Sequence, residues 1–119
     1  MQNNCLKAGF ARVDVTPSIG VPIIGYYIER KTEGVLDVLE ANAVAFSLGE
    51  QSAILISVDN CSLSSIRLNP IRENISKITG VPKDSILIHA THTHTGPGPS
   101  LTYGENDESL KEYWLTLEK

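Results

Sequence analysis

Hydrophobic and polar positions along the chain form three patterns that predict β-strands. Residues 8–15 alternate between apolar and polar side chains, which indicates a half-buried strand. Residues 41–48 place large apolar side chains on one face and small residues on the other. Residues 53–58 are apolar throughout, which is typical of a strand covered on both faces. Residues 49–51 predict a hairpin turn that joins the last two strands.

A helix is predicted after the third strand. Asn69 suits the N-cap, Pro70 suits the first helical position, and Gly80 suits the end of the helix. Whether residues 64–68 add an earlier turn stays open. Three isoleucines recur at helical spacing and share one face of this helix: Ile71, Ile75 and Ile78.

A further strand begins at Ile86, so strand, helix and strand follow one another. A crossover of this length predicts parallel neighbours in one sheet, and ligands gather at the carboxyl ends of such strands. The predicted fold class is therefore α/β, with a mixed β-sheet, a βαβ unit and a site at the carboxyl ends of the strands. Length favours a single domain over residues 1–119.

An amphipathic helix is predicted over residues 108–119, with Asp107 able to cap it. Its apolar side chains recur at helical spacing, and an aromatic stripe of this kind is typical of core: Leu110, Tyr113, Trp114 and Leu117. Because no stop signal follows, the helix looks cut within the element, so the domain is expected to be partial.

The loop predicted over residues 18–27 carries several apolar side chains, which either line a pocket or cover the core: Ile23, Ile24, Tyr26 and Tyr27.

Composition indicates a globular protein, with 41% hydrophobic and 20% charged residues. A net charge of −4 argues against nucleic acid as a partner. With no transmembrane run and no signal peptide, the chain as written is expected to be cytoplasmic. Cys5 and Cys61 match no metal-ligand spacing and are expected to be free, partly buried thiols.

All three histidines lie close to the predicted strand that begins at Ile86, namely His89, His92 and His94. If that strand persists through Thr95, the imidazoles of His92 and His94 project to one face and His89 to the other. A neutral imidazole is a good zinc ligand, although two histidines do not complete a site. The alternative is that both are polar strand-end residues hydrogen-bonded to neighbouring threonines, and the two interpretations stand near parity.

Asp59 follows the strand over residues 53–58, so the same edge rule places it beside the two histidines. Its carboxylate is a candidate ligand or a group that orients a ligand histidine. The alternative, an aspartate that caps the following turn, is slightly favoured.

Several motifs in order resemble the N-terminal part of the neutral/alkaline non-lysosomal ceramidase family. The most specific is Ala-Thr-His-Thr-His-Thr-Gly-Pro-Gly at residues 90–98. The others are Ala-Gly-Phe-Ala-Arg-Val-Asp-Val-Thr-Pro at 8–17, Gly25-Tyr26, Asp37 ahead of Ala-Asn-Ala at 41–43, and Ser-Val-Asp at 57–59. The resemblance covers nearly the whole chain and implies a fragment of a larger catalytic domain.

The resemblance implies a zinc-dependent amidase that cleaves the N-acyl bond of ceramide or a related N-acyl lipid. It implies that His92 is the zinc ligand of this segment and that His94 faces the substrate near the scissile carbonyl. Tyr26, Gly96 and Gly98 are then candidate substrate-lining residues. The family's other ligands (a second histidine, a glutamate and a tyrosine) and its catalytic serine match no position here, and its members are often secreted or membrane-associated.

Three hypotheses follow. The chain is part of a zinc amidohydrolase centre, and alone it is at best a weak zinc binder without competent amidase activity. Alternatively, it is a non-catalytic truncated remnant that needs a partner or the missing C-terminal part. The third is a small metal-binding module that completes its site in a symmetric dimer, with His92 from each copy.

Overall fold

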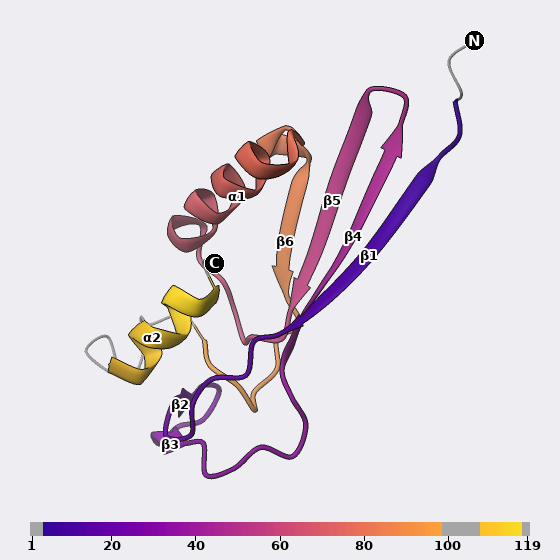
Figure 1. Cartoon of the computed structure of the whole chain (residues 1–119). Helices are drawn as coiled ribbons and strands as arrows, with labels where there is room; N and C mark the ends of the chain where they lie inside the picture. Colours follow the sequence, from indigo (N-terminus) through magenta and orange to yellow (C-terminus); the bar gives the residue numbers. More distant parts are fainter. Residues whose placement is uncertain (1–3, 99–107, 118–119) are drawn as a thin grey trace.

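The computed structural model describes residues 4–98 and 108–117, and these form two sheets and two α-helices (Figure 1). The strands are β1 (Lys7–Asp14), β2 (Pro22–Ile23), β3 (Arg30–Lys31), β4 (Glu40–Leu48), β5 (Gln51–Val58) and β6 (Ile86–Ala90). The helices are α1 (Ser65–Thr79) and α2 (Glu108–Leu117), with a 3₁₀ turn at Lys83–Ser85. Neither helix in this part of the chain is long and apolar enough to cross a bilayer.

The main sheet is mixed, in the order β1-β4-β5-β6. The pairs β1–β4 and β4–β5 are antiparallel, whereas β5 and β6 are parallel and are joined through α1. Gly49 closes the β4–β5 hairpin at φ 59°, a conformation that favours glycine. The predicted α/β class and the βαβ unit are therefore confirmed.

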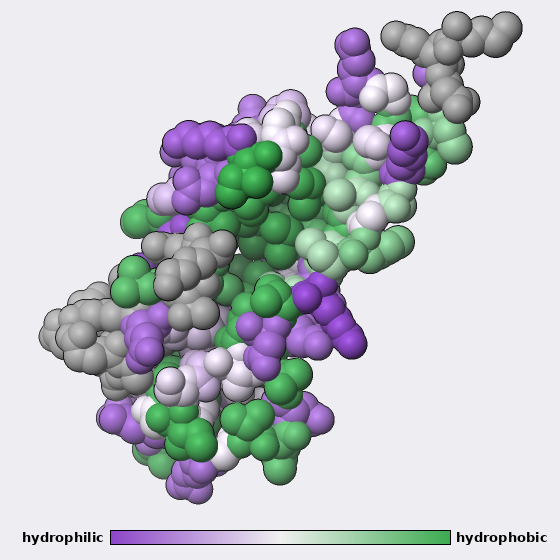
Figure 2. Space-filling view, in the orientation of Figure 1, coloured by the Kyte–Doolittle hydropathy of each residue, from purple (hydrophilic) through white to green (hydrophobic). Residues whose placement is uncertain are grey.

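Helix α1 packs on one face of this sheet and forms the main core with it. The buried residues of this core are Val15, Ile54, Val58, Leu68, Val81, Ile86 and Ile88. A groove of about 560 Å³ remains between α1 and the sheet, lined mostly by apolar side chains from both. Figure 2 shows hydrophobic surface in this region. Ile78 lines the groove together with Ile71 and Ile75, so the prediction that these three share one face of the helix is confirmed, although Ile78 itself is 83% exposed.

The other face of the sheet, called the open face here, is uncovered in the described part of the chain. The strand register aligns Phe10, Val44, Leu55 and Leu87 in one row across it. Leu55 and Leu87 are 40% and 53% exposed, so β5 is not covered on both faces as predicted. Every residue of β1 is exposed, and the expected half-burial of this edge strand is also wrong.

Helix α1 begins earlier than its cap signals predict. Ser64 is the N-cap, and its carbonyl accepts hydrogen bonds from the backbone N–H groups of Arg67 and Leu68. Asn69 is therefore not the N-cap, and Pro70 lies inside the helix. Burial of Leu68 holds this extra first turn on the core. The predicted end is confirmed, because Gly80 adopts φ 76° and donates to the carbonyl of Ser76.

Helix α2 packs against the loop that follows β1 and forms a second core. Trp114 and Tyr113 are 1% and 4% exposed, and Val21 beside them is fully buried. The aromatic stripe is therefore core, as predicted. Asp107 and the side chain of Leu110 lie outside the described residues. Within the loop, β2 pairs with β3, while Tyr27 is fully exposed and does not cover the core.

Candidate metal centre at the edge of the sheet

The parallel pairing of β5 and β6 brings two loops to one edge of the sheet. Val58 and Ala90 are register partners, so both strands end at the same level. The backbone N–H of Thr91 donates to the carbonyl of Val58 at 2.9 Å, and that of His92 donates to the carbonyl of Asn60 at 3.0 Å. The segments 59–61 and 91–95 therefore leave the sheet side by side, as the strand-end rule predicts.

The imidazoles of His92 and His94 face one another. Their Nε2 atoms are 3.4 Å apart, and the ring centroids are 4.9 Å apart. The predicted pairing of these two side chains is confirmed, but the reason given for it is wrong, because β6 ends at Ala90. His92 has φ 69°, so the pair comes from a turn and not from the alternation of a strand. His89 lies apart from this pair, within β6 on the open face and in register with Ser57.

One hydrogen bond fixes the protonation pattern of His92. Its Nδ1 lies 2.8 Å from the carbonyl oxygen of Cys61, and a carbonyl only accepts, so Nδ1 carries the proton. In a neutral ring, Nε2 then keeps its lone pair and points towards His94. Metal-binding histidines usually have this arrangement, in which the far nitrogen donates to a carbonyl or carboxylate.

Cys61 lies beside the two histidines, and its place in this cluster was not predicted from the sequence. One ligand atom each from Cys61, His92 and His94 can be chosen so that all three lie within 4.8 Å of one another. Cys61 is 5% exposed, and burial raises the pKa of its thiol. The edge rule that selected Asp59 applies equally to Cys61, two residues further on. Both thiols are free as predicted, but Cys5 is exposed where partial burial was expected.

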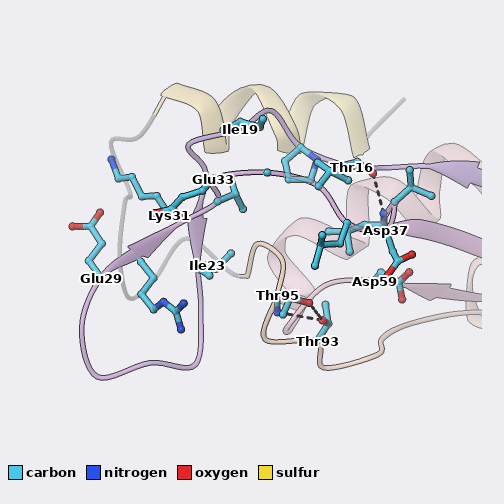
Figure 3. Close-up of a pocket in the computed structure, with 18 residues that line it drawn as sticks. Thr16, Ile19, Ile23, Glu29, Lys31, Glu33, Asp37, Asp59, Thr93 and Thr95 are labelled. Carbon is cyan, nitrogen blue, oxygen red and sulfur yellow. Dashed lines mark hydrogen bonds between the residues drawn. The ribbon is translucent and has the colours of Figure 1, made fainter.

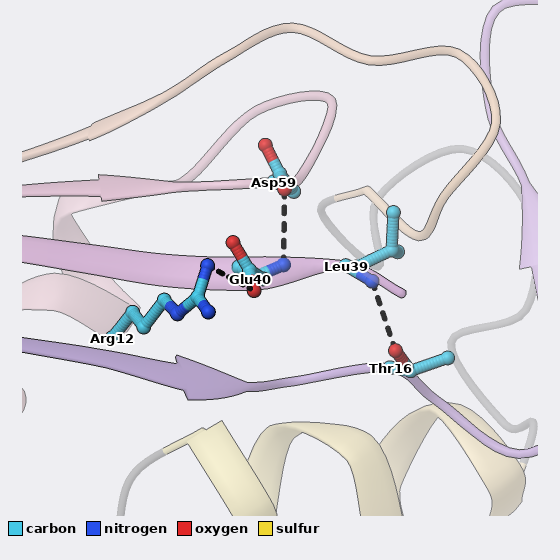
Figure 4. Close-up of polar contacts among 5 residues, drawn as sticks. All are labelled: Arg12, Thr16, Leu39, Glu40 and Asp59. Atoms are coloured by element: carbon cyan, nitrogen blue, oxygen red, sulfur yellow. Dashed lines mark hydrogen bonds and ion pairs between the residues drawn. The ribbon is translucent and has the colours of Figure 1, made fainter. Parts of the chain in front are cut away.

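Asp59 lies on the predicted edge and ties three strands together there. Its Oδ2 accepts from the backbone N–H of Glu40 at 2.9 Å (Figure 4), and its Oδ1 accepts from the hydroxyl of Thr91 at 3.1 Å. These bonds link the end of β5 to the start of β4 and to the residue before His92. The carboxylate thus holds the loop of the histidines, and the three-residue cluster above forms without it.

The predicted substrate-lining residues lie around His94 and beneath its loop. The Tyr26 ring stands edge-on to the His94 ring at a centroid distance of 6.4 Å. A Cβ on Gly25 would lie 2.5 Å from Cε1 of His94, so only glycine allows this approach. Gly96 and Gly98 are buried, and a Cβ on either would meet Leu39 or Ile24. Contact of these residues with a substrate stays a prediction.

A cavity of about 1130 Å³ adjoins this edge (Figure 3). Thr93 and Thr95, which alternate with the two histidines along the chain, line it together with Asp59. Its apolar side chains come from the segments before β4 and include Ile19, Ile23, Val35, Leu36, Val38 and Leu39. The same segments also place charged side chains in its lining, namely Glu29, Arg30, Lys31, Glu33 and Asp37. Of the four apolar residues noted in the loop over 18–27, Ile23 lines this cavity. The cavity is large enough for an acyl chain.

The donor geometry fits a metal ion such as zinc. Two nitrogens bound to one tetrahedral zinc at about 2.0–2.1 Å lie about 3.3 Å apart. The Nε2 atoms of His92 and His94 are separated by 3.4 Å. The fold and this cluster together define an α/β sheet whose edge carries two histidines and a cysteine, a set compatible with a metal ion.

The same fold occurs in solved ceramidase structures. The crystal structure of neutral ceramidase from Pseudomonas aeruginosa aligns with 95% of this chain and 20% of its own, at a TM-score of 0.78 and 21% identity. A structure of ceramidase complexed with C2 aligns with 95% of this chain and 19% of its own, at a TM-score of 0.74 and 22% identity.

The predicted resemblance to ceramidases is thereby confirmed at the level of the fold. The chain spans about a fifth of the length of the ceramidases it matches. Comparisons with protein-family models and with curated protein sequences give no significant match.

Proposed function

We propose that the chain forms the part of a zinc-dependent, ceramidase-like amidase centre that contributes His92 as a metal ligand and His94 as a substrate-facing group. The observation that carries the proposal is the Nε2–Nε2 distance of 3.4 Å, with His92 held in the tautomer of a metal ligand by the Cys61 carbonyl. The ceramidase-like fold over 95% of the chain supports it. The proposed substrate is an N-acyl lipid of the ceramide type.

Each residue has a distinct task in such a centre. When bound, zinc activates a water molecule and polarises the amide carbonyl. His92 would hold the ion through Nε2, while its Nδ1–H stays on the Cys61 carbonyl and fixes the ring. His94, when protonated, donates a hydrogen bond to the carbonyl oxygen as negative charge develops there. The aromatic edge of Tyr26 and the absence of a side chain at Gly25 set the position of His94.

We propose that the acyl chain occupies the cavity beside this cluster. The cavity of about 1130 Å³ carries apolar side chains, among them Ile23 and Leu36, and it reaches the histidine loop at Thr93 and Thr95. A lipid tail in this cavity would bring its amide group towards the loop of the two histidines. The remaining ligands that the resemblance implies match no position in this chain, so efficient hydrolysis is not expected of the chain alone.

Metal analysis of the purified chain tests the proposal. In equilibrium dialysis against a zinc-containing buffer, with bound zinc measured by mass spectrometry, the wild-type chain and the His89→Ala control should bind zinc weakly, whereas His92→Ala should bind none. His89 is a matched control because it lies on the open face, away from the cluster. Release of fatty acid from a fluorescent ceramide should be slow or absent, and robust turnover would show that the chain holds a complete site. Zinc binding by His92→Ala equal to that of wild type would refute the ligand assignment.

A further inference from the structure

We infer that Cys61 is a third protein ligand, so that Cys61, His92 and His94 form a three-ligand site for zinc or a similar divalent cation within this chain. This assignment rests on the metal-binding part of the proposed function and goes beyond it, because no ligand from another part of a larger protein is then required to hold the ion.

The three side chains come from two loops that are fixed to each other. The backbone N–H of Cys61 donates to the carbonyl of Pro97 at 3.0 Å, and its carbonyl accepts from Nδ1 of His92. Cys61 is therefore linked to segment 91–97 on both sides of its Cα. Its Sγ is 3.8 Å from the His92 ring, at Nδ1, and the residue is buried. The thiol is held against the histidine pair and not in solvent.

The distances are close to those of a formed site. Donor atoms of a tetrahedral zinc site with nitrogen and sulfur ligands lie about 3.3–3.6 Å apart. One ligand atom from each of the three residues can be chosen so that all lie within 4.8 Å of one another, which is wider than in a formed site. Because the Cys61 thiol lies 3.8 Å from Nδ1 of His92, its side chain must turn towards the Nε2 atoms, and the donors must close by roughly 1 Å, for one ion to be bound. Two imidazoles and one thiolate, with one position left for water, make up the three-ligand pattern of open zinc sites. On binding, the thiol proton is released to solvent and the sulfur bonds to the ion without any change of oxidation state.

The assignment also explains why low amidase activity is expected of the chain alone. When Nε2 of His94 binds the ion, it cannot donate a hydrogen bond to a substrate carbonyl. In the isolated chain, His94 is thus predicted to be a ligand of the ion, and it becomes a hydrogen-bond donor to substrate only where other ligands replace it.

Cobalt(II) is a spectroscopic substitute for zinc that reports thiolate ligation. Titration of the reduced full chain with Co²⁺ should give tetrahedral ligand-field bands and a near-ultraviolet thiolate-to-cobalt charge-transfer band. The Cys61→Ser variant should lose the charge-transfer band and bind Co²⁺ at least tenfold more weakly. The matched control Cys5→Ser, which removes the exposed cysteine, should change neither.

A second readout does not depend on whether Cys61→Ser folds. In the Cys5→Ser background, saturating Zn²⁺ should slow alkylation of the remaining thiol at least tenfold. If Co²⁺ binds in a His92-dependent way but without a charge-transfer band, and Zn²⁺ gives no protection, the role of Cys61 is refuted and the proposed function survives. If the folded wild-type chain binds neither ion, both are refuted.

Discussion

Replacement of Gly25 by alanine should separate the two histidines while the rest of the fold persists. Gly25 has φ 102°, and a Cβ there would lie 2.5 Å from Cε1 and 2.6 Å from Cγ of His94. Contacts shorter than about 3 Å do not survive, so the imidazole must move by roughly 1 Å to reach ordinary van der Waals distance. His94 then no longer holds its Nε2 at 3.4 Å from that of His92.

Gly20 provides a matched control for the backbone cost. It has φ 95°, but a Cβ there meets nothing within 4 Å. A side chain in this region of φ costs about 1–3 kcal/mol, and both alanine variants should show a loss of this size in the free energy of unfolding. Only Gly25→Ala should also lose metal affinity, by at least tenfold, which corresponds to about 1.4 kcal/mol.

Urea denaturation and Co²⁺ titration of both variants measure the two quantities independently. The expected result is a similar loss of stability in Gly25→Ala and Gly20→Ala, with wild-type Co²⁺ affinity in Gly20→Ala alone. Equal Co²⁺ affinity in the two variants would contradict the geometry, because it would mean that the position of His94 does not depend on Gly25.

Two further predictions concern the cores and are tested by urea denaturation. Burial raises the pKa of Tyr113, whose hydroxyl accepts from the Asn60 side chain, so the unfolded chain ionises first as the pH rises past the usual value of 10.0. Stability should therefore fall above pH 10.0, and Tyr113→Phe should reduce this alkaline loss while it costs about 1 kcal/mol at neutral pH. The buried Cys61 thiol, whose pKa is also raised, contributes the part of the alkaline loss that remains. An unchanged alkaline slope in Tyr113→Phe would refute this. Leu68→Ala, in the main core, should cost about 2–5 kcal/mol, whereas Leu87→Ala on the open face should change stability by only about 0.5 kcal/mol. Equal losses at the two leucines would show that the open face is covered in solution.

The order of strands and helices was predictable because periodicity records which side chains are apolar. Periodicity does not record what covers them. Leu55 belongs to an apolar run that predicts a strand buried on both faces, yet its side chain is 40% exposed because the described part of the chain supplies a helix layer on one face only. The same limit explains β1, whose alternation is real although neither of its faces is buried.

The start of α1 shows how local signals compete. Asn69-Pro70 is a strong N-terminal signal, but Ser64 is also a residue type favoured at the N-cap and lies one turn and a half earlier, although its side chain makes no capping hydrogen bond. The extra turn buries Leu68, whose transfer from water contributes about 1.5–3 kcal/mol, and it adds backbone hydrogen bonds from Arg67 and Leu68 to the Ser64 carbonyl, at about 1 kcal/mol each. Pro70 then lies inside the helix, where it lacks the N–H that would bond to the carbonyl of Ile66 and its ring crowds that carbonyl, at a cost of about 3 kcal/mol. The earlier cap is adopted because burial and backbone bonding together exceed this cost.

The histidine pair was predicted from the sequence, although by an alternation that ends with β6 at Ala90, whereas the neighbouring Cys61 was not predicted. The rule that loops meet at the carboxyl ends of parallel strands applies to Cys61 as well as to Asp59, but two cysteines 56 positions apart give no spacing that suggests a metal site. The approach of Gly25 to His94 was also hidden, because it depends on the path of a loop between β1 and β4 that carries no periodic signal. Contacts between loops need the sheet to be in place first.

The strained backbone conformation of His92 connects the fold to the geometry of the site. A non-glycine residue at φ 69° lowers the stability of the fold by about 1–2 kcal/mol. A segment with no role except to end the strand would avoid this backbone conformation. Two hydrogen bonds offset this loss, from the backbone N–H of His92 to the Asn60 carbonyl and from its Nδ1 to the Cys61 carbonyl. Both acceptors lie in the loop after β5, so the same contacts that stabilise the strained turn also aim Nε2 at His94. Strain held in this way beside a candidate metal site is typical of a functional site.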